Sequence, residues 1–271
     1  IRLSLVGSEM CIRDRSNAVQ DFAPYIVRKR MGATSFNYII GDEVAQGWYD
    51  NPRSPVVLPQ DAHDQSFHGD RQMQIGWPEM DILREHIALP GSQLIECGSH
   101  HGLTTILLSA WVGPSGFVHS FDAVLENASI VKKNLTLNKI SNVAAYCAAM
   151  SDEFGILDMF NQSNVITKKT GVLSANSTLG VKVSSFFDRP PDAIKIDVEG
   201  AELKMLESER EWIANIPRIA IEVHTDYLPA DGIPRLLAAL GNRRLFVLRD
   251  EKEIRPYGGE PITERVHLFS W

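Results

Sequence analysis

Charged side chains gather in the segment Ile194–Glu202, which reads Ile-Lys-Ile-Asp-Val-Glu-Gly-Ala-Glu. A lysine inside an apolar run, followed by three acids around a glycine, is unusual because buried charges are costly. Lys195, Asp197 and Glu199 are therefore candidates for binding a polar group and exchanging protons with it. The structural alternative is that acids in the first turn of a helix complement the helix dipole.

His224, in the segment Glu222-Val-His224, is a second candidate for proton transfer. Glu222 and His224 face the same way in an extended chain, because side chains alternate along a strand. Histidine titrates close to neutral pH, which suits acid–base chemistry. A buried structural histidine explains the residue equally well.

The segment Glu96–Gly102, Glu-Cys-Gly-Ser-His-His-Gly, follows a short apolar run. Its glycines let the backbone turn sharply and approach a ligand, and the free N–H groups of a helix expected from about Leu103 point into the same space. The G-x-x-x-G spacing does not match the dinucleotide fingerprint G-x-G-x-x-G. A tight strand-to-helix turn is the equally good alternative.

Two more acidic positions follow expected strands. Asp122 lies some twenty residues after the glycine loop, where an acid can accept hydrogen bonds from both ribose hydroxyls of a nucleotide. Its alternative role is that of a helix cap. Ser151 and Asp152 follow the next strand and could contact an adenine edge, or they form a plain turn.

The elements that must position these residues alternate between strands and helices from Pro78 onward. Strands are expected at 94–97, 117–121, 143–147, 193–196, 219–223, 245–248 and 266–269, with short ones at 156–160 and 181–183; helices are expected after Pro78 and at 104–111, 124–138, 201–206 and 233–240. This order predicts an α/β fold with a doubly wound, mostly parallel sheet. No helix separates the last two strands, so we expect an antiparallel C-terminal edge hairpin. Ligands of such sheets bind beyond the carboxyl ends of the strands, where the candidates lie.

Composition and charge exclude several classes of protein. The 271 residues include 27 Lys and Arg against 34 Asp and Glu, a formal net charge of −7, which argues against nucleic-acid binding. No apolar run approaches the roughly 18 residues of a membrane-spanning helix. The three cysteines lack metal-ligand spacing, which favours a reducing compartment, and the cytoplasm is the expected location.

The chain divides into three parts by its patterns. Residues 1–15 do not look native, because Glu9–Arg15 resembles the translation of a transposase adapter used in sequencing libraries. We expect adapter read-through there, with the natural start of the protein missing. Residues 16–75 are rich in turn chemistry and are expected to form an irregular N-terminal extension or lid. Residues 76–271 hold the expected sheet domain.

Together these motifs resemble the FkbM family of S-adenosylmethionine-dependent methyltransferases, from about Pro78 to Val223. The segment 194–202 is similar to the family signature almost residue for residue, and the supporting motifs lie at 95–102, 121–122, 134–138, 149–152 and 221–224. The resemblance implies a class I methyltransferase (Rossmann-like) sheet that binds S-adenosylmethionine. It implies that Glu96 and Gly98 lie by the methionine part of the cofactor, in a binding loop with Ser99, His100 and Gly102, that Asp122 binds the ribose, and that Ser151 and Asp152 lie near the adenine.

The sequence departs from the family at three places. The family usually has Asp at Glu96, Ala-Asn at Ser99-His100, and Glu-Pro at Asp122-Ala123. Glu96 and Asp122 preserve the charge and change the reach by one methylene. His100 is the departure with most effect, because it could alter the cofactor contacts or the methyl-transfer site.

The implied reaction is methyl transfer to a hydroxyl of a sugar, glycan or secondary metabolite. A protonated hydroxyl is a poor nucleophile, so it needs a base or a metal ion that lowers its pKa. Our hypothesis makes His224 or Asp197 the base and lets Lys195 and Glu199 shape the pocket. A divalent cation held by Asp197, Glu199 and Glu222 is less favoured, so no metal is assigned.

Other functions fit the sequence less well. A nicotinamide-dependent dehydrogenase would show G-x-G-x-x-G, and a nucleic-acid amino-group methyltransferase would show an Asn/Asp-Pro-Pro-Tyr motif where Asp197–Gly200 stands. A non-catalytic module of the same fold, which binds a nucleoside or a partner, stays as the alternative because of His100. The expected partner is a small-molecule or glycan acceptor. The sequence carries no signal for the acceptor's identity or the oligomeric state.

Overall fold

A computed structural model of the chain describes residues 23–31, 34–43, 45–46, 78–159, 166–170, 177–249 and 253–271. The expectations for residues 1–15 and for the segment 47–77 lie outside the described residues. Among the helices that are described, none has the length and hydrophobicity that crossing a bilayer requires.

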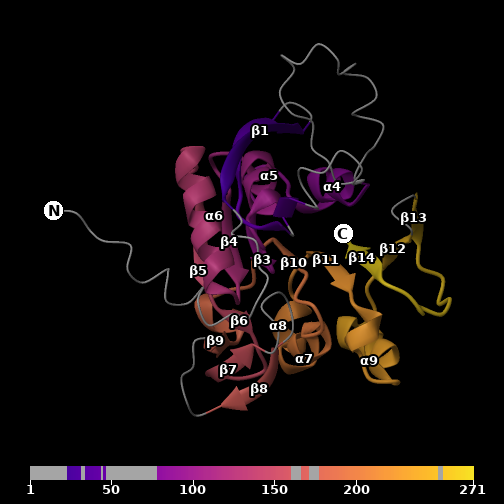
Figure 1. Cartoon of the computed structure of the whole chain (residues 1–271). Coiled ribbons are helices and arrows are strands. Elements are labelled where there is room, and N and C mark those ends of the chain that lie inside the picture. The colour runs from indigo at the N-terminus through magenta and orange to yellow at the C-terminus, as the bar shows by residue number, and fades with distance from the viewer. Residues whose placement is uncertain are drawn as a thin grey trace.

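The centre of the molecule is an eight-stranded sheet with the order β13-β12-β14-β11-β10-β3-β4-β5 (Figure 1). Its strands are β3 (Gln93–Cys97), β4 (Phe117–Asp122), β5 (Val143–Cys147), β10 (Ala193–Ile196), β11 (Arg218–Val223), β12 (Phe246–Arg249), β13 (Glu253–Pro256) and β14 (Val266–Ser270). The strands β5, β4, β3, β10 and β11 run parallel, and β14 is antiparallel to both β11 and β12. The predicted α/β class and the doubly wound, mostly parallel sheet with an antiparallel C-terminal edge are confirmed.

The C-terminal edge differs from the prediction in one respect. β14 lies inside the sheet between β11 and β12, and the unpredicted strand β13 forms the outer edge. β13 is short and polar and ends at Pro256, which are features of edge strands that a period-2 hydrophobic pattern does not reveal.

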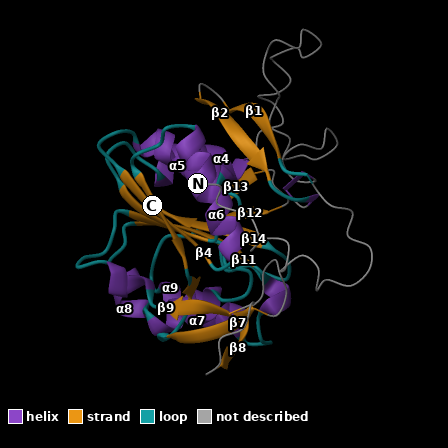
Figure 2. Cartoon of the chain, turned by 60° about the vertical axis from the view of Figure 1, so that its left-hand side comes forward, coloured by secondary structure: helices purple, strands orange, loops and turns teal. Residues whose placement is uncertain are grey.

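Helices cover both faces of the sheet (Figure 2). One face carries α4 (Pro78–Ile82), which continues as a π-helix over Leu83–Ile87, together with α5 (Leu103–Val112) and α6 (Leu125–Leu137); the other carries α7 (Glu202–Ser208), α8 (Arg210–Ile213) and α9 (Gly232–Leu240). Side chains that alternate along a strand serve the two faces, as Leu94 and Ile95 of β3 belong to separate buried clusters. Burial on both faces explains the near-continuous apolar runs of the central strands.

A second, four-stranded sheet with the order β6-β9-β7-β8 lies in the sequence between β5 and β10 of the central sheet. Its strands are β6 (Ala149–Met150), β7 (Gly155–Met159), β8 (Ile166–Thr170) and β9 (Ser177–Val181). The prediction of a strand at 181–183 was wrong, because β9 ends at Val181 and a 3-10 helix begins at Val183. The Glu209 carboxylate accepts hydrogen bonds from the N–H groups of Val183 and Ser184, at 3.0 and 2.7 Å, and so fixes that turn.

The extension contains regular structure, contrary to the prediction. β1 (Tyr25–Met31) and β2 (Thr34–Ile40) form an antiparallel hairpin. Alternate side chains of β2 (Phe36, Tyr38 and Ile40) are buried in the same apolar cluster as α5. The period-2 spacing of these apolar residues is a pattern that predicts a strand. The turn-rich sequence around them led instead to the prediction of an irregular segment.

Two asparagines of α6 hold the backbone of β2. Asn138 accepts a hydrogen bond from the Asn37 N–H and donates one to the Asn37 carbonyl, both at 2.7 Å. Asn134 accepts a hydrogen bond from the Ile39 N–H at 2.8 Å and donates one to the His101 carbonyl at 2.8 Å. The motif at 134–138 therefore joins the extension to the glycine loop.

We expect Asn134→Ala to lower the free energy of unfolding by about 1–3 kcal/mol, because it leaves buried backbone groups without partners. Hydrogen exchange at the Ile39 amide should accelerate, since that amide loses its acceptor. Asn215→Ala is the matched control, because the Asn215 amide makes only an exposed bond to the Glu211 carbonyl within its own turn. Equal denaturation midpoints for the two variants would contradict this role of Asn134.

Candidate functional site

The order of the central sheet reverses between β3 and β10, so the loops after these strands lie side by side. Gly98, directly after β3, has a φ of +88°, and a Cβ atom there would lie 1.7 Å from the carbonyl oxygen of Asp197. The Gly98 N–H donates to the Phe121 carbonyl at 2.8 Å. Only glycine fits this close approach. The structure thus brings the glycine loop and the acidic segment 197–199 into contact.

Glu96 is buried at the end of β3. Its Oε2 accepts a hydrogen bond from the Thr105 hydroxyl at 2.5 Å, while its Oε1 is buried with no hydrogen-bond partner among the described residues. Burial raises the pKa of Glu96 to about 7. An unpaired carboxylate oxygen at this place is suited to receive a positively charged or hydrogen-bonding group.

Asp122 links the glycine loop to the start of α6. One of its oxygens accepts from the His100 N–H at 2.7 Å, and the other accepts from the Val124 N–H at 2.9 Å and the Asn127 amide at 3.1 Å. Burial raises the pKa of Asp122 to about 6. Asp122 therefore orders the turn before α6 and does not cap the helix, whose N-cap is Val124. It lies next to the loop, and its contact with a ribose stays a prediction.

His100 and His101 stack on each other in this loop, with ring centroids 4.1 Å apart. His100 has a φ of +48°, a region that asparagine adopts more readily than histidine. Burial lowers the pKa of His100 to about 4. The buried His101 places its Nε2 3.4 Å from Asp42 Oδ2, so the segment after β2 reaches the loop. Sequence reasoning missed Asp42, because nothing in its neighbourhood predicts a contact across about sixty residues.

Ser151 and Asp152 lie at the end of β6. The Ser151 N–H donates to the Val181 carbonyl at 2.9 Å, and its hydroxyl donates to Asp152 at 3.2 Å. Ser151 is buried and Asp152 is exposed. Ser151 and Asp152 therefore form the turn that was one of the two expectations, and their contact with the adenine stays a prediction.

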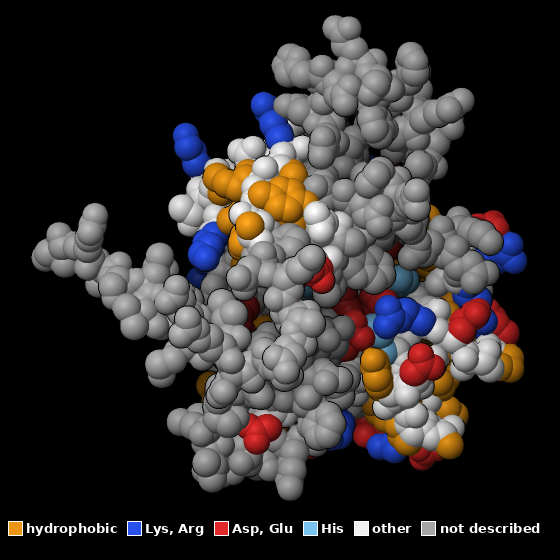
Figure 3. Space-filling view, viewed as in Figure 1, with side chains coloured by type: hydrophobic (Ala, Val, Ile, Leu, Met, Phe, Trp, Pro, Cys, Tyr) orange, Lys and Arg blue, Asp and Glu red, His pale blue; other side chains and the backbone are white. Residues whose placement is uncertain are grey.

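The candidate catalytic residues converge beyond the ends of β10 and β11. We call them the charged cluster, with these members: Glu79, Lys195, Asp197, Glu199, Glu202, Glu222, His224, Arg265 and His267. In Figure 3, acidic, basic and histidine side chains lie beside one another over the ends of β11 and β14. The predicted grouping of Lys195, Asp197, Glu199 and His224 is therefore present in the fold.

His224 is buried and is held from one side. Its Nδ1 lies 2.7 Å from Glu202 Oε1, and the Glu202 carboxylate also accepts from the Gly200 N–H at 2.9 and 3.1 Å. The His224 Nε2 faces three carboxylates, those of Glu199, Glu222 and Asp197, at 3.2, 3.6 and 3.8 Å. Burial by itself lowers the pKa of His224, but Glu202 and the other carboxylates raise it above its ordinary value.

Lys195 is buried beside two acids. Its Nζ lies 3.0 Å from Asp197 Oδ2 and 3.9 Å from Glu79 Oε1. Burial raises the pKa of Asp197, but Lys195 and His224 outweigh that effect and lower it. Asp197 is therefore ionised at neutral pH, with Oδ2 bound to Lys195 and Oδ1 turned towards His224.

Comparison with known proteins agrees with this architecture. The model of the methyltransferase FkbM domain matches residues 96–248, which is more than half of the chain. The chain belongs to the FkbM methyltransferase family. No curated protein matches it.

Several solved structures are similar to this FkbM chain. The FkbM methyltransferase of Methylobacillus flagellatus is 15% identical to this chain, with a TM-score of 0.46. The match covers 66% of this chain and 43% of the Methylobacillus protein. This chain therefore spans less than half the length of that protein. An S-adenosylmethionine-dependent O-methyltransferase of Thermotoga maritima is 16% identical (TM-score 0.45, 90% and 76% covered). Aeropyrum pernix fibrillarin with bound S-adenosylmethionine is 10% identical (TM-score 0.46, 73% and 74% covered).

Four members of the charged cluster had no predicted role: Glu79, Glu202, Arg265 and His267. Glu79 comes from the first turn of α4 and lies 3.4 Å from the Nε2 of His267, which is also 3.4 Å from Glu222. Burial lowers the pKa of His267, but Glu79 and Glu222 raise it to about 10. Glu202 belongs to the family signature, so the sequence marked the residue itself. Its contact with His224 could not be predicted from the sequence.

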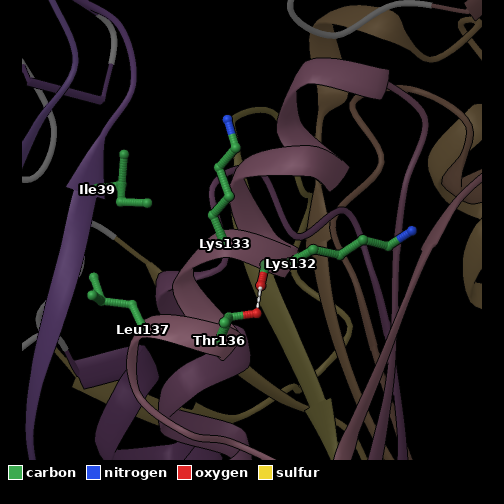
Figure 4. Close-up of a pocket in the computed structure, with 5 residues that line it drawn as sticks. All are labelled: Ile39, Lys132, Lys133, Thr136 and Leu137. Atoms are coloured by element: carbon green, nitrogen blue, oxygen red, sulfur yellow. Dashed lines mark hydrogen bonds between the residues drawn. The ribbon is translucent and has the colours of Figure 1, made fainter. Parts of the chain in front are cut away.

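A shallow pocket of about 360 Å³ lies elsewhere, between β2 and the second half of α6. Its lining residues are Ile39, Lys132, Lys133, Thr136 and Leu137 (Figure 4). The two lysine ammonium groups point away from the apolar side chains. It shares no residue with the loop after β3 or with the charged cluster, so we assign it no part in the chemistry.

Proposed function

We propose that the chain moves a methyl group from S-adenosylmethionine to an acceptor hydroxyl of a sugar, glycan or secondary metabolite. The observation that carries this proposal is the contact of Gly98 with the backbone of Asp197. It sets the family's cofactor loop against a cluster of groups that can bind and deprotonate a hydroxyl. Membership of the FkbM family supports methyl transfer as the reaction.

The described residues fit the cofactor. The unpaired Glu96 Oε1 suits the ammonium of its amino-acid part, and the loop formed by Gly98, Ser99, His100 and Gly102 is assigned to the rest of the methionine part. We assign Asp122 to the ribose, because its Oδ2 lies beside the glycine loop, where it accepts a hydrogen bond from the His100 N–H. Ser151 and Asp152 are assigned to the adenine.

S-adenosylmethionine supplies a methyl group already activated by its sulfonium, so the protein mainly aligns the acceptor and takes its proton. We propose His224 or Asp197 as the proton acceptor, with Lys195 and Glu199 shaping the pocket. Glu202 supports His224, because it receives the Nδ1 hydrogen and leaves Nε2 facing the carboxylates of Asp197, Glu199 and Glu222. The raised pKa of His224 means that it accepts a proton readily but must first be neutral.

Calorimetry with S-adenosylmethionine and with S-adenosylhomocysteine, followed by detection of S-adenosylhomocysteine formed with a panel of hydroxylated acceptors, tests the proposal. Binding of the cofactor and its turnover with a sugar or glycan acceptor would support it. Cofactor binding without turnover on any acceptor would instead indicate a nucleoside-binding module.

Cofactor affinity should fall as the pH drops below about 7, the raised pKa of Glu96. Above that pKa the carboxylate is ionised and attracts the ammonium group, while below it the carboxyl is neutral. The dissociation constant should rise up to about tenfold for each pH unit of protonation. Calorimetric titrations on both sides of this pKa measure the effect. Glu96→Gln should bind weakly and lose the pH dependence near 7, so that only the titration of Asp122 at about 6 remains. An unchanged profile in that variant would exclude Glu96 as the cause.

A further inference from the structure

We propose that Asp197, Glu199 and His224 bind a divalent metal ion such as Mn²⁺ or Zn²⁺. The ion would sit beyond the carboxyl ends of β10 and β11, next to the contact between Gly98 and Asp197. Its role rests on the proposed function, because the ion would act on the acceptor hydroxyl of that reaction. Its binding can be tested without the reaction.

The distances around His224 Nε2 match a set of metal ligands better than a hydrogen bond. This atom is buried and has no hydrogen-bond partner among the described residues. Glu199 Oε2 is 3.2 Å away and Asp197 Oδ1 is 3.8 Å away, whereas a charge-assisted hydrogen bond would measure about 2.7–2.9 Å. Two ligands each about 2.1 Å from a common ion lie roughly 3.0–3.5 Å apart. The three ligand atoms all lie within 4.8 Å of one another.

The imidazole of His224 is already oriented for this role. Glu202 is fully buried and is fixed by the Gly200 N–H, and it holds the Nδ1 of His224 at 2.7 Å. A carboxylate on the far nitrogen is the usual support of a metal-bound histidine, since it sets the ring orientation and strengthens the ligand.

The excess of carboxylates in the charged cluster also favours the binding of a cation. Five carboxylates (Glu79, Asp197, Glu199, Glu202 and Glu222) meet three cations in the described part of the chain: Lys195, Arg265 and His267, whose pKa of about 10 keeps it protonated. Buried carboxylates need compensation by cations, protons or metal ions. Lys195 occupies Oδ2 of Asp197 and leaves Oδ1 open. A divalent ion would displace the proton that His224 otherwise shares with the acids.

The donor set indicates the kind of ion. One imidazole with two carboxylates suits Mn²⁺, Fe²⁺ or Zn²⁺, while Mg²⁺ prefers a shell of oxygen atoms. Three protein ligands leave coordination positions for an acceptor oxygen, whose hydroxyl pKa the ion would lower. With the ion bound, His224 is a ligand and not the base; the ion would lower the pKa of the hydroxyl, and the released proton would pass to a neighbouring carboxylate such as Glu222 or to water.

The test is titration of the full chain, freed of metal with a chelator, with Mn²⁺ and with Zn²⁺, followed by calorimetry and, for Mn²⁺, by electron paramagnetic resonance. We expect binding of one ion per chain and a loss of at least about tenfold in affinity in Glu199→Gln, which keeps the side-chain shape. Asp42→Asn is the control, because Asp42, His100 and His101 form the other group of ligand atoms within 4.8 Å. Thermal melts verify that each variant is folded.

Two binding results would overturn the inference. One is the absence of a binding signal at millimolar Mn²⁺ and Zn²⁺, and the other is an affinity that Glu199→Gln leaves unchanged or that Asp42→Asn removes. Full methyl transfer in the presence of chelator would also overturn it, while leaving the methyltransferase proposal intact. Mn²⁺ binding in a chain that binds no S-adenosylmethionine would support the metal site and contradict the proposed function.

Discussion

The Asp197→Asn and His224→Gln variants are each expected to lose methyl transfer by about 10²–10⁴-fold while still binding S-adenosylmethionine. Both residues are the proposed proton acceptors, and His224 Nε2 is 3.8 Å from Asp197 Oδ1. Neither side chain belongs to the loop assigned to the cofactor. Rates of S-adenosylhomocysteine formation and calorimetric dissociation constants separate the two effects.

Variant design matters at this position because Glu202 is fully buried beside His224. His224→Ala would leave that carboxylate without a partner and could unfold the chain, whereas Gln can still donate to it. Asp231→Asn, at an exposed acid that precedes α9 and pairs with Arg235, is the control and should retain the wild-type rate. Retention of full activity by both Asp197→Asn and His224→Gln would show that the charged cluster is not the catalytic centre.

Gly98→Ala should destabilise the fold by more than about 4 kcal/mol, the range reserved for severe steric or burial defects. A Cβ atom there would lie 1.7 Å from the Asp197 carbonyl oxygen, so one of the two central strands must move. The φ of +88° adds the strain that any L side chain meets in this region. Chemical denaturation measures the loss, and cofactor binding should disappear with it.

Gly91→Ala provides a matched control for this effect. Gly91 has a similar φ of +82°, but the nearest atom to a Cβ there is 3.6 Å away. It should therefore cost only the backbone strain, about 1–2 kcal/mol. Equal losses of stability in the two variants would mean that the contact between Gly98 and Asp197 is not tight.

The sequence was a good guide to the parallel sheet and to the residues at its strand ends. Buried strands such as Ala193–Ile196 are short apolar runs bounded by glycine and acids, a pattern that local rules detect. The ligand rule for doubly wound sheets then placed Gly98, Asp122, Asp197 and His224 at one edge, where the structure has them.

The partners of those residues could not be predicted, because they depend on contacts between distant parts of the chain. Glu79 and His267 meet from opposite ends of the domain, and Asp42 reaches His101 only because the β1–β2 hairpin packs on α6. None of these residues belongs to a local sequence motif that predicts its partner. The pairing of strands and helices, and not any short motif, decides such contacts.

The most direct test of the cofactor site is a calorimetric titration of the folded chain with S-adenosylmethionine. We predict saturable binding of one molecule per chain, accompanied by a higher melting temperature. A well-folded chain that gives no heat at millimolar S-adenosylmethionine would contradict the assignment of the Gly98 loop and Asp122 to the cofactor.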